Sequence, residues 1–476
     1  MSLRKPRMIA SAAAALALSG CMVAGHDYKR PELDIPARHA VMLQAGEAQS
    51  AANIAWFDLY RDPQLQSLIR EALDHNLDLQ LAFARIDEVQ GRLRTTRSQM
   101  FPSLDGSLQT GASPQPNAND SAFTLGLLLN WEVDLFGKLR RQNEAARAQL
   151  LATRASKEAV VTTIVNQVAA TWLTIRELQA EERILTYNIG LQKRSLSLVQ
   201  SLHRSGVVSD SEEQQAKGQL AGTQAQLPAV RKARLVNENN LAILLGRYPA
   251  PIELEPAGTD GGDGLGADHF AHDLPLGVPT DLLARRPDVI SAEQSLAAAT
   301  AQEGVAIANR FPFPTIGLSA IFGRSSTQIT SLFDNNKSAS LNSWGPNVQL
   351  PILSFGRDQG NVDVARAQTR QALIQYRQAV QSALFDVNQA VYGYRAAQEQ
   401  LGPLSDQLAA ARRSLHLQNL QFKAGVSDYL SVLDAQRSLL STELSVAQSR
   451  LQRDLAFADL YKALGGGWSP SESAGK

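Results

Sequence analysis

The sequence contains a single cysteine among its 476 residues, which excludes an intramolecular disulfide. Its 46 basic and 46 acidic side chains cancel, so no basic field points to nucleic acid. It also lacks a Walker loop, a Gly-x-Ser-x-Gly elbow, a His-Glu-x-x-His motif and a dinucleotide fingerprint. We therefore expect no enzyme activity, no cofactor, no metal centre and no nucleic-acid partner.

An apolar run from Met8 to Leu18 is too short to span a membrane as a helix. It follows a basic start and ends at Leu18-Ser19-Gly20-Cys21, the pattern of a bacterial lipoprotein signal. An ordinary secretory signal with an incidental cysteine is the alternative. We expect removal of residues 1–20 and acylation of Cys21, with palmitate among its chains, because each buried methylene adds about 0.8 kcal/mol. Met22 stands where aspartate usually retains lipoproteins in the inner membrane, so known sorting rules favour the outer membrane.

Proline and glycine are missing from 138 to 189, a segment rich in Ala, Leu, Arg, Gln and Glu. We expect a helix that persists to about Arg204 and approaches roughly 100 Å at 1.5 Å per residue. A counterpart is expected at about 361–423, with irregularity at Gly393 and Gly402-Pro403. An earlier helix is expected from Asp62-Pro63 to about Gln99, since its apolar residues recur at helical spacing.

Glycines mark the points where the two long helices turn back. Gly206 and Gly425 suit C-cap positions, and returning helices are expected at 209–245 and 429–464. The apolar residues of the second returning helix follow the spacing of a coiled coil with a stutter.

The chain also repeats itself at an offset of 219 residues, which indicates a tandem duplication. Gly425-Val426 falls on Gly206-Val207, and Ala-Arg-Ala-Gln at 365–368 falls on the same tetrapeptide at 146–149. Further upstream, Phe313-Pro314 matches Phe101-Pro102 at an offset of 212. Seven extra residues are therefore expected between these marks and the long helix of the second copy.

Each copy contains one stretch in which the period changes to two. Apolar and polar residues alternate in a hairpin at about 103–135 and in another at about 315–354. Strands of roughly ten residues can cross a bilayer when tilted, although hairpins on a soluble core would show the same alternation. A lone hairpin is marginal in water, and an open sheet edge in lipid leaves amides unpaired. Four strands cannot close a barrel, so three chains would have to pool twelve.

These features divide the chain into six segments. They are a signal peptide at 1–20, a lipidated arm at 21–61, a first repeat at 62–246, a linker at 247–280, a second repeat at 281–465 and a tail at 466–476. The Gly/Asp-rich part of the linker resembles one calcium-binding turn, but such sites come in arrays, so a plain linker is favoured. His269 and His272 lack partners at metal-ligand spacing.

Several motifs in order resemble the outer-membrane factor lipoproteins of the OprM and NodT type, relatives of TolC. Besides the lipoprotein signal they are Asp27-Tyr-Lys-Arg-Pro31, Trp131-Glu-Val-Asp-Leu-Phe-Gly-Lys-Leu-Arg-Arg141, Leu282-Leu-Ala-Arg-Arg-Pro-Asp288, Val432-Leu-Asp-Ala-Gln-Arg437 and Leu460-Tyr-Lys-Ala-Leu-Gly-Gly-Gly-Trp468. The resemblance implies an α+β, TolC-like fold: a homotrimer whose twelve-stranded transmembrane β-barrel continues into a long periplasmic α-barrel. It implies an equatorial girdle built from the linker and both termini. Outer-membrane lipid, a periplasmic adaptor (a membrane fusion protein) and an inner-membrane RND-type pump are the implied partners.

The function implied is a passive exit duct for drugs or other small molecules in a tripartite efflux system, with a part in antibiotic resistance. A duct for type I protein secretion is the closest alternative, and a lipid-anchored adaptor is the alternative of another class. The paired hairpins argue against an adaptor, and the lipoprotein signal is typical of efflux members.

The resemblance also places the periplasmic aperture and the adaptor contacts near the two helix tips. The adaptor contacts are expected at the turns of Gly206, Val207, Gly425 and Val426. For the aperture the expected residues are Asp434, Glu212, Ser431 and Phe422. The chain departs from the family there, with Phe422 in place of an aromatic hydroxyl and Ser431 in place of a carboxylate. Asp434 could face the channel axis or pair with Arg437 at i+3 on an exposed helix.

Overall fold

The computed structural model describes residues 23–34, 59–112, 121–252, 254, 285–310 and 312–466. Cys21, most of the expected linker and the tail beyond 466 lie outside the described residues. The chain divides into two compact units. The sheet unit comprises Met1–Leu33, Ala84–Ala155 and Ile290–Ala379, and the tip unit comprises Asp34–Phe83, Ser156–Val289 and Val380–Lys476.

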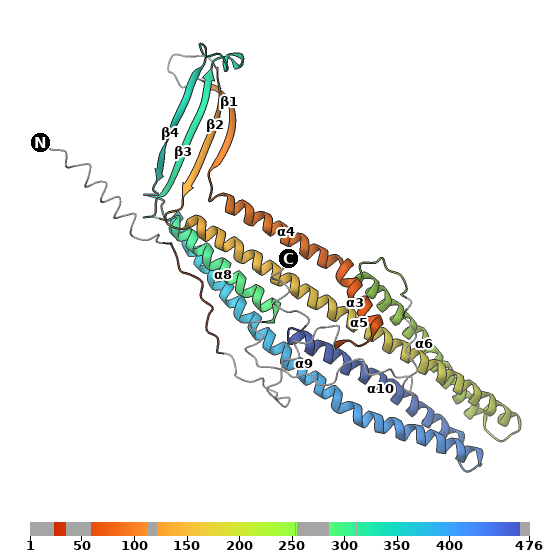
Figure 1. Cartoon of the computed structure of the whole chain (residues 1–476). Helices are drawn as coiled ribbons and strands as arrows, with labels where there is room; N and C mark the ends of the chain where they lie inside the picture. Colours follow the sequence, from red (N-terminus) through yellow and green to blue (C-terminus); the bar gives the residue numbers. More distant parts are fainter. Residues whose placement is uncertain are drawn as a thin grey trace. The chain divides into compact units, whose positions relative to one another are not determined.

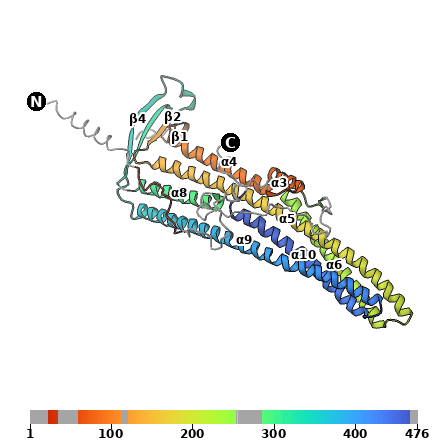
Figure 2. The same ribbon diagram turned by 60° about the horizontal axis from the view of Figure 1, so that its bottom comes forward.

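The helices confirm the duplication in their lengths. Helix α5 spans Lys138–Arg204 and α9 spans Arg357–Lys423, each 67 residues. Helices α6 (Asp210–Leu244) and α10 (Tyr429–Ala463) have 35 residues each. All four pairs of boundaries differ by 219, the offset of the sequence repeat. In the tip unit α6 folds back along α5, and α10 along α9 (Figure 1). The same pairing appears in the second view (Figure 2).

The expected irregularity in α9 is not found. The helix runs unbroken through Gly393 and Gly402, and Pro403 lies inside it. A proline in a helix removes one backbone hydrogen bond, and the helix here continues on both sides of it. The predicted end at Lys423 is confirmed, and the predicted start is four residues late.

The four strands form one antiparallel sheet in the order β1-β2-β3-β4. They span Ser103–Ala112 (β1), Ser121–Val133 (β2), Thr315–Ser326 (β3) and Ala339–Gln349 (β4). The two predicted hairpins are confirmed, and the β2–β3 pairing joins them, from Phe123 opposite Ser326 to Val133 opposite Ile316. Within the described residues, β1 and β4 therefore pair on one side only.

The seven extra residues of the second copy lie next to its strands. Four lengthen the connection between the strands, which spans 327–338 against 113–120 in the first copy. This longer connection contains the short 3-10 helix η3 (Ile329–Ser331). The other three residues lie between β4 and α9.

The period-two alternation stays in register across all four strands. On one face Leu104 lies opposite Leu129, Leu129 opposite Ala320, and Ala320 opposite Trp344. On the other face Ser103, Asn130, Ser319 and Gly345 form the neighbouring row. The apolar face is uncovered within the chain, since Leu104 is 63% exposed and Trp344 is 77% exposed. One face of the sheet is thus apolar and lacks a partner among the described residues.

The prediction of one helix from residue 62 to 99 is wrong in one respect, because the structure has two helices in this range. Helix α3 spans Pro63–His75 and α4 spans Leu77–Ser98. Asn76 between them has extended backbone angles, and its side-chain oxygen accepts from the amides of Asp78 and Leu79. Its Nδ2 donates to the carbonyl of Leu244 at 2.8 Å, at the end of α6. The remaining helix, α8, spans Pro287–Ala308.

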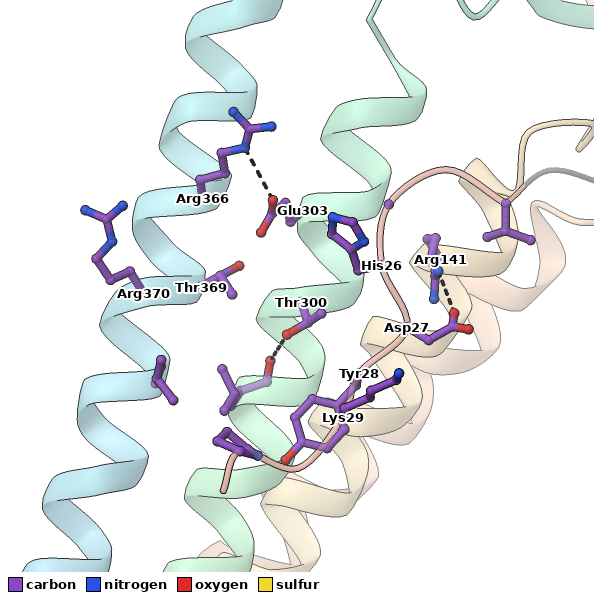
Figure 3. Close-up of a pocket in the computed structure, with 15 residues that line it drawn as sticks. His26, Asp27, Tyr28, Lys29, Arg141, Thr300, Glu303, Arg366, Thr369 and Arg370 are labelled. Atoms are coloured by element: carbon purple, nitrogen blue, oxygen red, sulfur yellow. Dashed lines mark hydrogen bonds and ion pairs between the residues drawn. The ribbon is translucent and has the colours of Figure 1, made fainter. Parts of the chain in front are cut away.

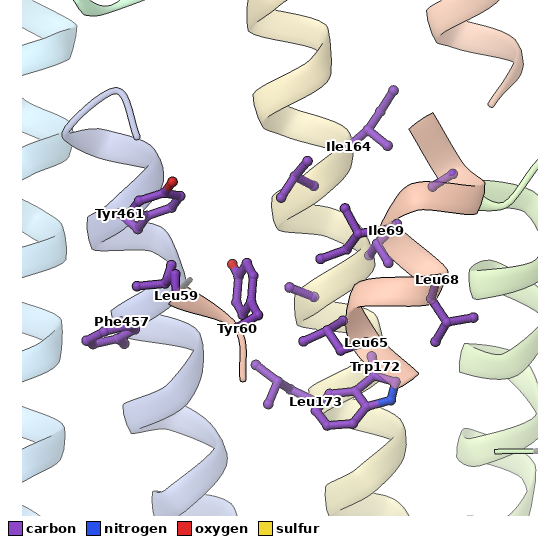
Figure 4. Packing of buried hydrophobic residues seen from close by; sticks show 14 of the residues in the cluster. Leu59, Tyr60, Leu65, Leu68, Ile69, Ile164, Trp172, Leu173, Phe457 and Tyr461 are labelled. Atoms are coloured by element: carbon purple, nitrogen blue, oxygen red, sulfur yellow. The ribbon is translucent and has the colours of Figure 1, made fainter. Parts of the chain in front are cut away.

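A hydrophobic core holds the tip unit together where α3 meets α5 and α10 (Figure 4). Trp172 of α5, Leu65 of α3 and Phe457 of α10 are all at most 2% exposed. Tyr60, just before α3, fills the same cluster. Burying one large apolar side chain contributes about 1.5–3 kcal/mol, so this cluster fixes the short helix against the long ones.

No helix within the described ranges combines the length and the apolar character that a membrane span needs.

Glu177 of α5 is a buried carboxyl in the tip unit. It is 9% exposed, and burial together with the nearby Glu181 raises its pKa to about 7. In the unfolded chain its pKa returns to about 4.5, so the folded state binds the proton more tightly. The resulting stabilisation is present below about pH 4.5 and is lost as the pH rises through about 7.

We predict that Glu177→Gln raises the apparent melting temperature at pH 8, by the equivalent of roughly 1–3 kcal/mol, and changes it little at pH 5. The reason is that an amide has no charge to bury at high pH. Circular dichroism melts of the detergent-solubilised protein at both pH values measure this. Glu88→Gln, at an exposed carboxylate paired with Arg92, is the control. Equal shifts at both pH values would contradict the prediction.

Candidate functional site

The two tip turns have the same hydrogen-bonding pattern. Gly206 has φ +72° and donates to the carbonyl of His203, while Val207 donates to Leu202. Gly425 has φ +71°, and the second turn repeats both bonds at positions 219 residues later. This is the Schellman motif, which needs a left-handed residue and so favours glycine. The sequence prediction of both turns is confirmed.

Each turn exposes one apolar side chain. Val207 is 68% exposed and Val426 is 79% exposed. A Cβ on Gly206 or Gly425 would meet nothing within 4 Å, so both turns are open on their outer side. The expected adaptor contacts therefore lie on a free surface of the chain.

Glu212, expected at the aperture, caps the helix that begins at the first tip. Its Oε2 accepts from the amide of Ser209 at 2.7 Å, and Ser209 Oγ accepts from the amide of Glu212 at 3.3 Å. This reciprocal capping box satisfies two amides that the start of α6 would leave unpaired.

The second tip uses Asp428 as its cap. Asp428 Oδ1 accepts from the Ser431 hydroxyl at 2.8 Å and from its amide at 3.1 Å. Both hydrogen bonds lower the pKa of Asp428, and the one from the Ser431 hydroxyl has the larger effect. Ser431, another expected aperture residue, is thus held by the cap, and its hydroxyl hydrogen is directed at Asp428.

Asp434 forms the ion pair that the sequence allows. Its Oδ1 lies 3.3 Å from Arg437 Nη1, and the Asp434 side chain is 63% exposed. Arg437 Nε also donates to Gln219 Oε1 of α6 at 2.6 Å. The pair therefore links α10 to α6, and the carboxylate stays exposed to solvent.

Phe422 packs on Tyr429 across the second turn. Their ring centroids are 5.3 Å apart with planes tilted by 57°. Tyr429 is 2% exposed and belongs to a core cluster with Val432 and Leu433. The sequence singled out Phe422 alone, because Tyr429 lies seven residues further on, beyond the turn.

A buried arginine holds the N-terminal arm in the sheet unit (Figure 3). The Arg141 side chain is 4% exposed, and its three nitrogens donate to the carbonyl of Ala24, to Asp27 and to Glu144. Gly304 of α8 allows this approach, since a Cβ there would lie 3.0 Å from the Ala24 oxygen. Arg141 lies in a motif that the sequence analysis quoted, but its two partners in the arm, Ala24 and Asp27, lie more than a hundred residues away in sequence.

Glu293 of α8 holds the next part of the arm, at Tyr28 and Arg30. Arg30 donates to both of its carboxylate oxygens, at 2.8 and 2.6 Å, and the Tyr28 hydroxyl donates at 3.2 Å. The Glu293 side chain is 7% exposed and that of Arg30 is 52% exposed, so the carboxylate is shielded from water while the guanidinium remains partly solvated. The pKa of Tyr28 is raised, mainly by burial and secondly by the negative charge of Glu293. The hydroxyl therefore stays protonated and can donate its hydrogen bond. Cys21, the expected lipidation site, lies just outside the described residues.

Arg286 of the tip unit belongs to the motif Leu282-Leu-Ala-Arg-Arg-Pro-Asp288, and its contacts show what this part of the motif does. Its Nη2 lies 2.7 Å from Asp288 and 2.9 Å from Asp386 of α9, while Nη1 donates to the last carbonyl of α10, Ala463. The residue thus ties the start of α8 to the middle of α9 and to the C-terminal end of α10, a structural role.

The arrangement defines a class of protein. Paired long helices end in open apolar turns, and a four-stranded sheet presents a bare apolar face, as expected for a channel of the outer membrane. The chain belongs to the outer membrane efflux protein family, whose model matches residues 68–247 and 278–466. The two matched segments correspond to the two copies.

Comparisons with single proteins agree with the family. The cation efflux system protein CusC of Escherichia coli O6:H1 is 31% identical, over 95% of this chain and 97% of that protein. The solvent efflux pump outer membrane protein SrpC of Pseudomonas putida is 30% identical, over 97% and 98%. The crystal structure of the open state of the Neisseria gonorrhoeae MtrE outer membrane channel has a TM-score of 0.83 at 28% identity, covering 94% of this chain and 98% of that one. The TolC-like fold is therefore confirmed.

We predict that Glu293→Ala releases the arm. Arg30 and Tyr28 lose their shared acceptor, and a loss of roughly 1.4 kcal/mol corresponds to about tenfold faster opening. Trypsin cleavage after Lys29 in the purified protein measures it, since Pro31 protects the bond after Arg30. Glu303→Ala, on the same helix with Arg366 at 3.5 Å, is the control and should leave the rate unchanged. Equal rates in all three proteins would show that the ion pair does not hold the arm.

Proposed function

We propose that this chain, as a homotrimer, forms the outer-membrane exit duct of a tripartite efflux system. The observation that carries the proposal is the sheet, whose apolar face is uncovered and whose two outer edges are unpaired within the described part of the chain. Lipid accepts the apolar face, and neighbouring chains complete the edges, because unpaired backbone amides in lipid cost several kcal/mol each. Three chains supply twelve strands, enough to close a barrel of bacterial type.

The helix tips are the proposed docking points for a periplasmic adaptor. The turns at Gly206-Val207 and Gly425-Val426 offer exposed apolar side chains on backbone that the Schellman bonds keep rigid. An RND-type pump in the inner membrane supplies the energy. The relatives carry names that refer to cations and to solvents, which fits a wide duct that leaves the choice of substrate to the pump.

Acylation of Cys21 would anchor each chain at the outer membrane. Ala24 donates to the carbonyl of Phe136, between β2 and α5, at 2.9 Å, so the arm passes the base of the sheet. A lipidated residue three positions earlier would lie close to the membrane surface. This geometry supports a lipid anchor in addition to the strands.

The periplasmic aperture is proposed at Asp434, with Glu212, Ser431 and Phe422 near the same tips. Asp434 lies nine residues after the turn glycine, and its carboxylate is exposed within the chain. Around a threefold axis the three copies would form a ring of negative charge that attracts cations.

We predict that Leu104→Asp/Leu108→Asp abolishes export, because it places charge on the apolar face, where a basic residue near the bilayer midplane costs about 2–4 kcal/mol and an acidic one somewhat less. Ser107→Asp/Gln109→Asp adds the same charge to the opposite face of β1 and should retain export. Drug susceptibility of a duct-deficient strain carrying each variant is the readout. Light scattering of the detergent-solubilised wild type should give three times the chain mass. A stable monomer, or equal sensitivity of both faces, would overturn the proposal.

We predict that Asp434→Ala/Glu212→Gln loosens the aperture and so increases single-channel conductance, and that loss of the negative ring weakens the cation preference. Planar bilayer recording measures both quantities. Arg437→Ala breaks the ion pair but keeps the carboxylates, so it should preserve the cation preference. Asp406→Ala, an exposed acid in α9, is the neutral control. Unchanged conductance and selectivity in the double variant would leave Asp434 as a surface residue.

A further inference from the structure

The first helix tip contains three metal-binding side chains that the second tip lacks. One donor atom each of His203, Asp210 and Glu213 lies within 4.8 Å of the other two. His203 lies in the last turn of α5, and the two acids belong to the first turn of α6. The cluster therefore bridges the tip turn from both sides.

The equivalent positions of the second copy show what this bridge replaces. At the offset of 219, His203, Asp210 and Glu213 correspond to Phe422, Tyr429 and Val432. There the turn is closed by the Phe422–Tyr429 ring contact, and Val432 is 1% exposed beneath it. The first tip has no apolar group at any of the three positions. Polar contacts take the place of apolar packing there: His203 Nδ1 with the carbonyl of Val208, and Glu213 with Lys217 and Gln200.

The hydrogen bonds at the first tip leave, on each of the three side chains, one atom whose lone pair can bind a metal ion. His203 Nδ1 lies 3.1 Å from the carbonyl of Val208, and because a carbonyl only accepts, Nδ1 carries the hydrogen and Nε2 keeps its lone pair. A histidine that ligates a metal commonly donates its other N–H to a carbonyl in this way. Asp210 accepts from Gln214 through Oδ1, which leaves Oδ2.

Glu213 is the most enclosed of the three. Its side chain is 13% exposed, and its contacts with Lys217 at 2.8 Å and Gln200 at 3.4 Å both use Oε1, which leaves Oε2. The favourable position of acids at the start of a helix accounts for Asp210 and Glu213 taken alone. It does not account for the imidazole that faces them from the end of α5.

The geometry points to a binding site for a divalent transition metal ion such as Zn²⁺, held by His203, Asp210 and Glu213 with water completing the shell. One imidazole and two carboxylates form a nitrogen and oxygen donor set that suits zinc and its neighbours. Bonds of about 2.0–2.1 Å require donors about 3.3 Å apart, so binding draws the side chains together by up to about 1.5 Å. Bound metal would cross-link α5 to α6 across the turn, as the aromatic pair links α9 to α10.

This site does not rest on the proposed duct function, and direct binding tests it. Zn²⁺ is titrated calorimetrically into the full, detergent-solubilised protein without a histidine tag, after treatment with a chelator. One ion per chain is expected. His203→Gln should weaken binding by roughly 10–100-fold or more. Asp406→Ala, at an exposed acid of α9 outside the triad, should bind as the wild type does.

A triple variant gives the matched control. His203→Phe/Asp210→Tyr/Glu213→Val transfers the second tip's own residues to the first tip, where the backbone turn is the same. It should fold and lose the site. Trypsin cleavage after the exposed Arg204 gives a second readout, because Zn²⁺ should slow it in the wild type and leave it unchanged in the triple variant. The assignment is overturned if the wild type binds no Zn²⁺, or if the triple variant binds it equally well.

Discussion

Backbone hydrogen bonding at the two open edges of the sheet is the constraint on which the rest of the structure depends. Among the residues that the structure describes, β1 and β4 each have a partner on one side only, and lipid offers none for the other. A chain with a single four-stranded sheet must therefore share its edges with other chains. The apolar face alone would require only a membrane surface, whereas the edges require more copies of the chain.

Ion pairs with one largely buried partner hold the arm where the sheet meets the helices. Arg141 and Glu293 carry opposite charges, and each is satisfied by groups of the arm. Leaving either unpaired would strand a buried charge, which costs several kcal/mol. The arm is thus fixed by directional hydrogen bonds, which only one position of the arm can satisfy together. A lipid anchor at its end would restrain the position of the whole sheet unit.

The long helices and the hairpins could be predicted from the sequence because their signals are local. The absence of proline and glycine, together with the glycine at each turn, placed the ends of α5 correctly and those of α6 and α10 within one residue. The break at Asn76 was missed because the carbonyl that holds its side chain is 168 residues away. The cluster of His203, Asp210 and Glu213 was missed for a related reason, since its spacing makes sense only once the chain has turned. Whether Asp434 faces an axis depends on neighbouring chains, so no single chain contains the answer.

The equal lengths of the helices limit how such a chain can change in evolution. Arg437 of α10 contacts Gln219 of α6, and these positions differ by 218, so equivalent levels of the two copies lie side by side. At 1.5 Å per residue, a seven-residue insertion in α5 and again in α6 would push one tip about 10 Å beyond the other. A partner that docks on both tips would then reach only one. Insertions and deletions in this part of the chain should therefore survive only in matched sets of four, one in each long helix and one in each returning helix.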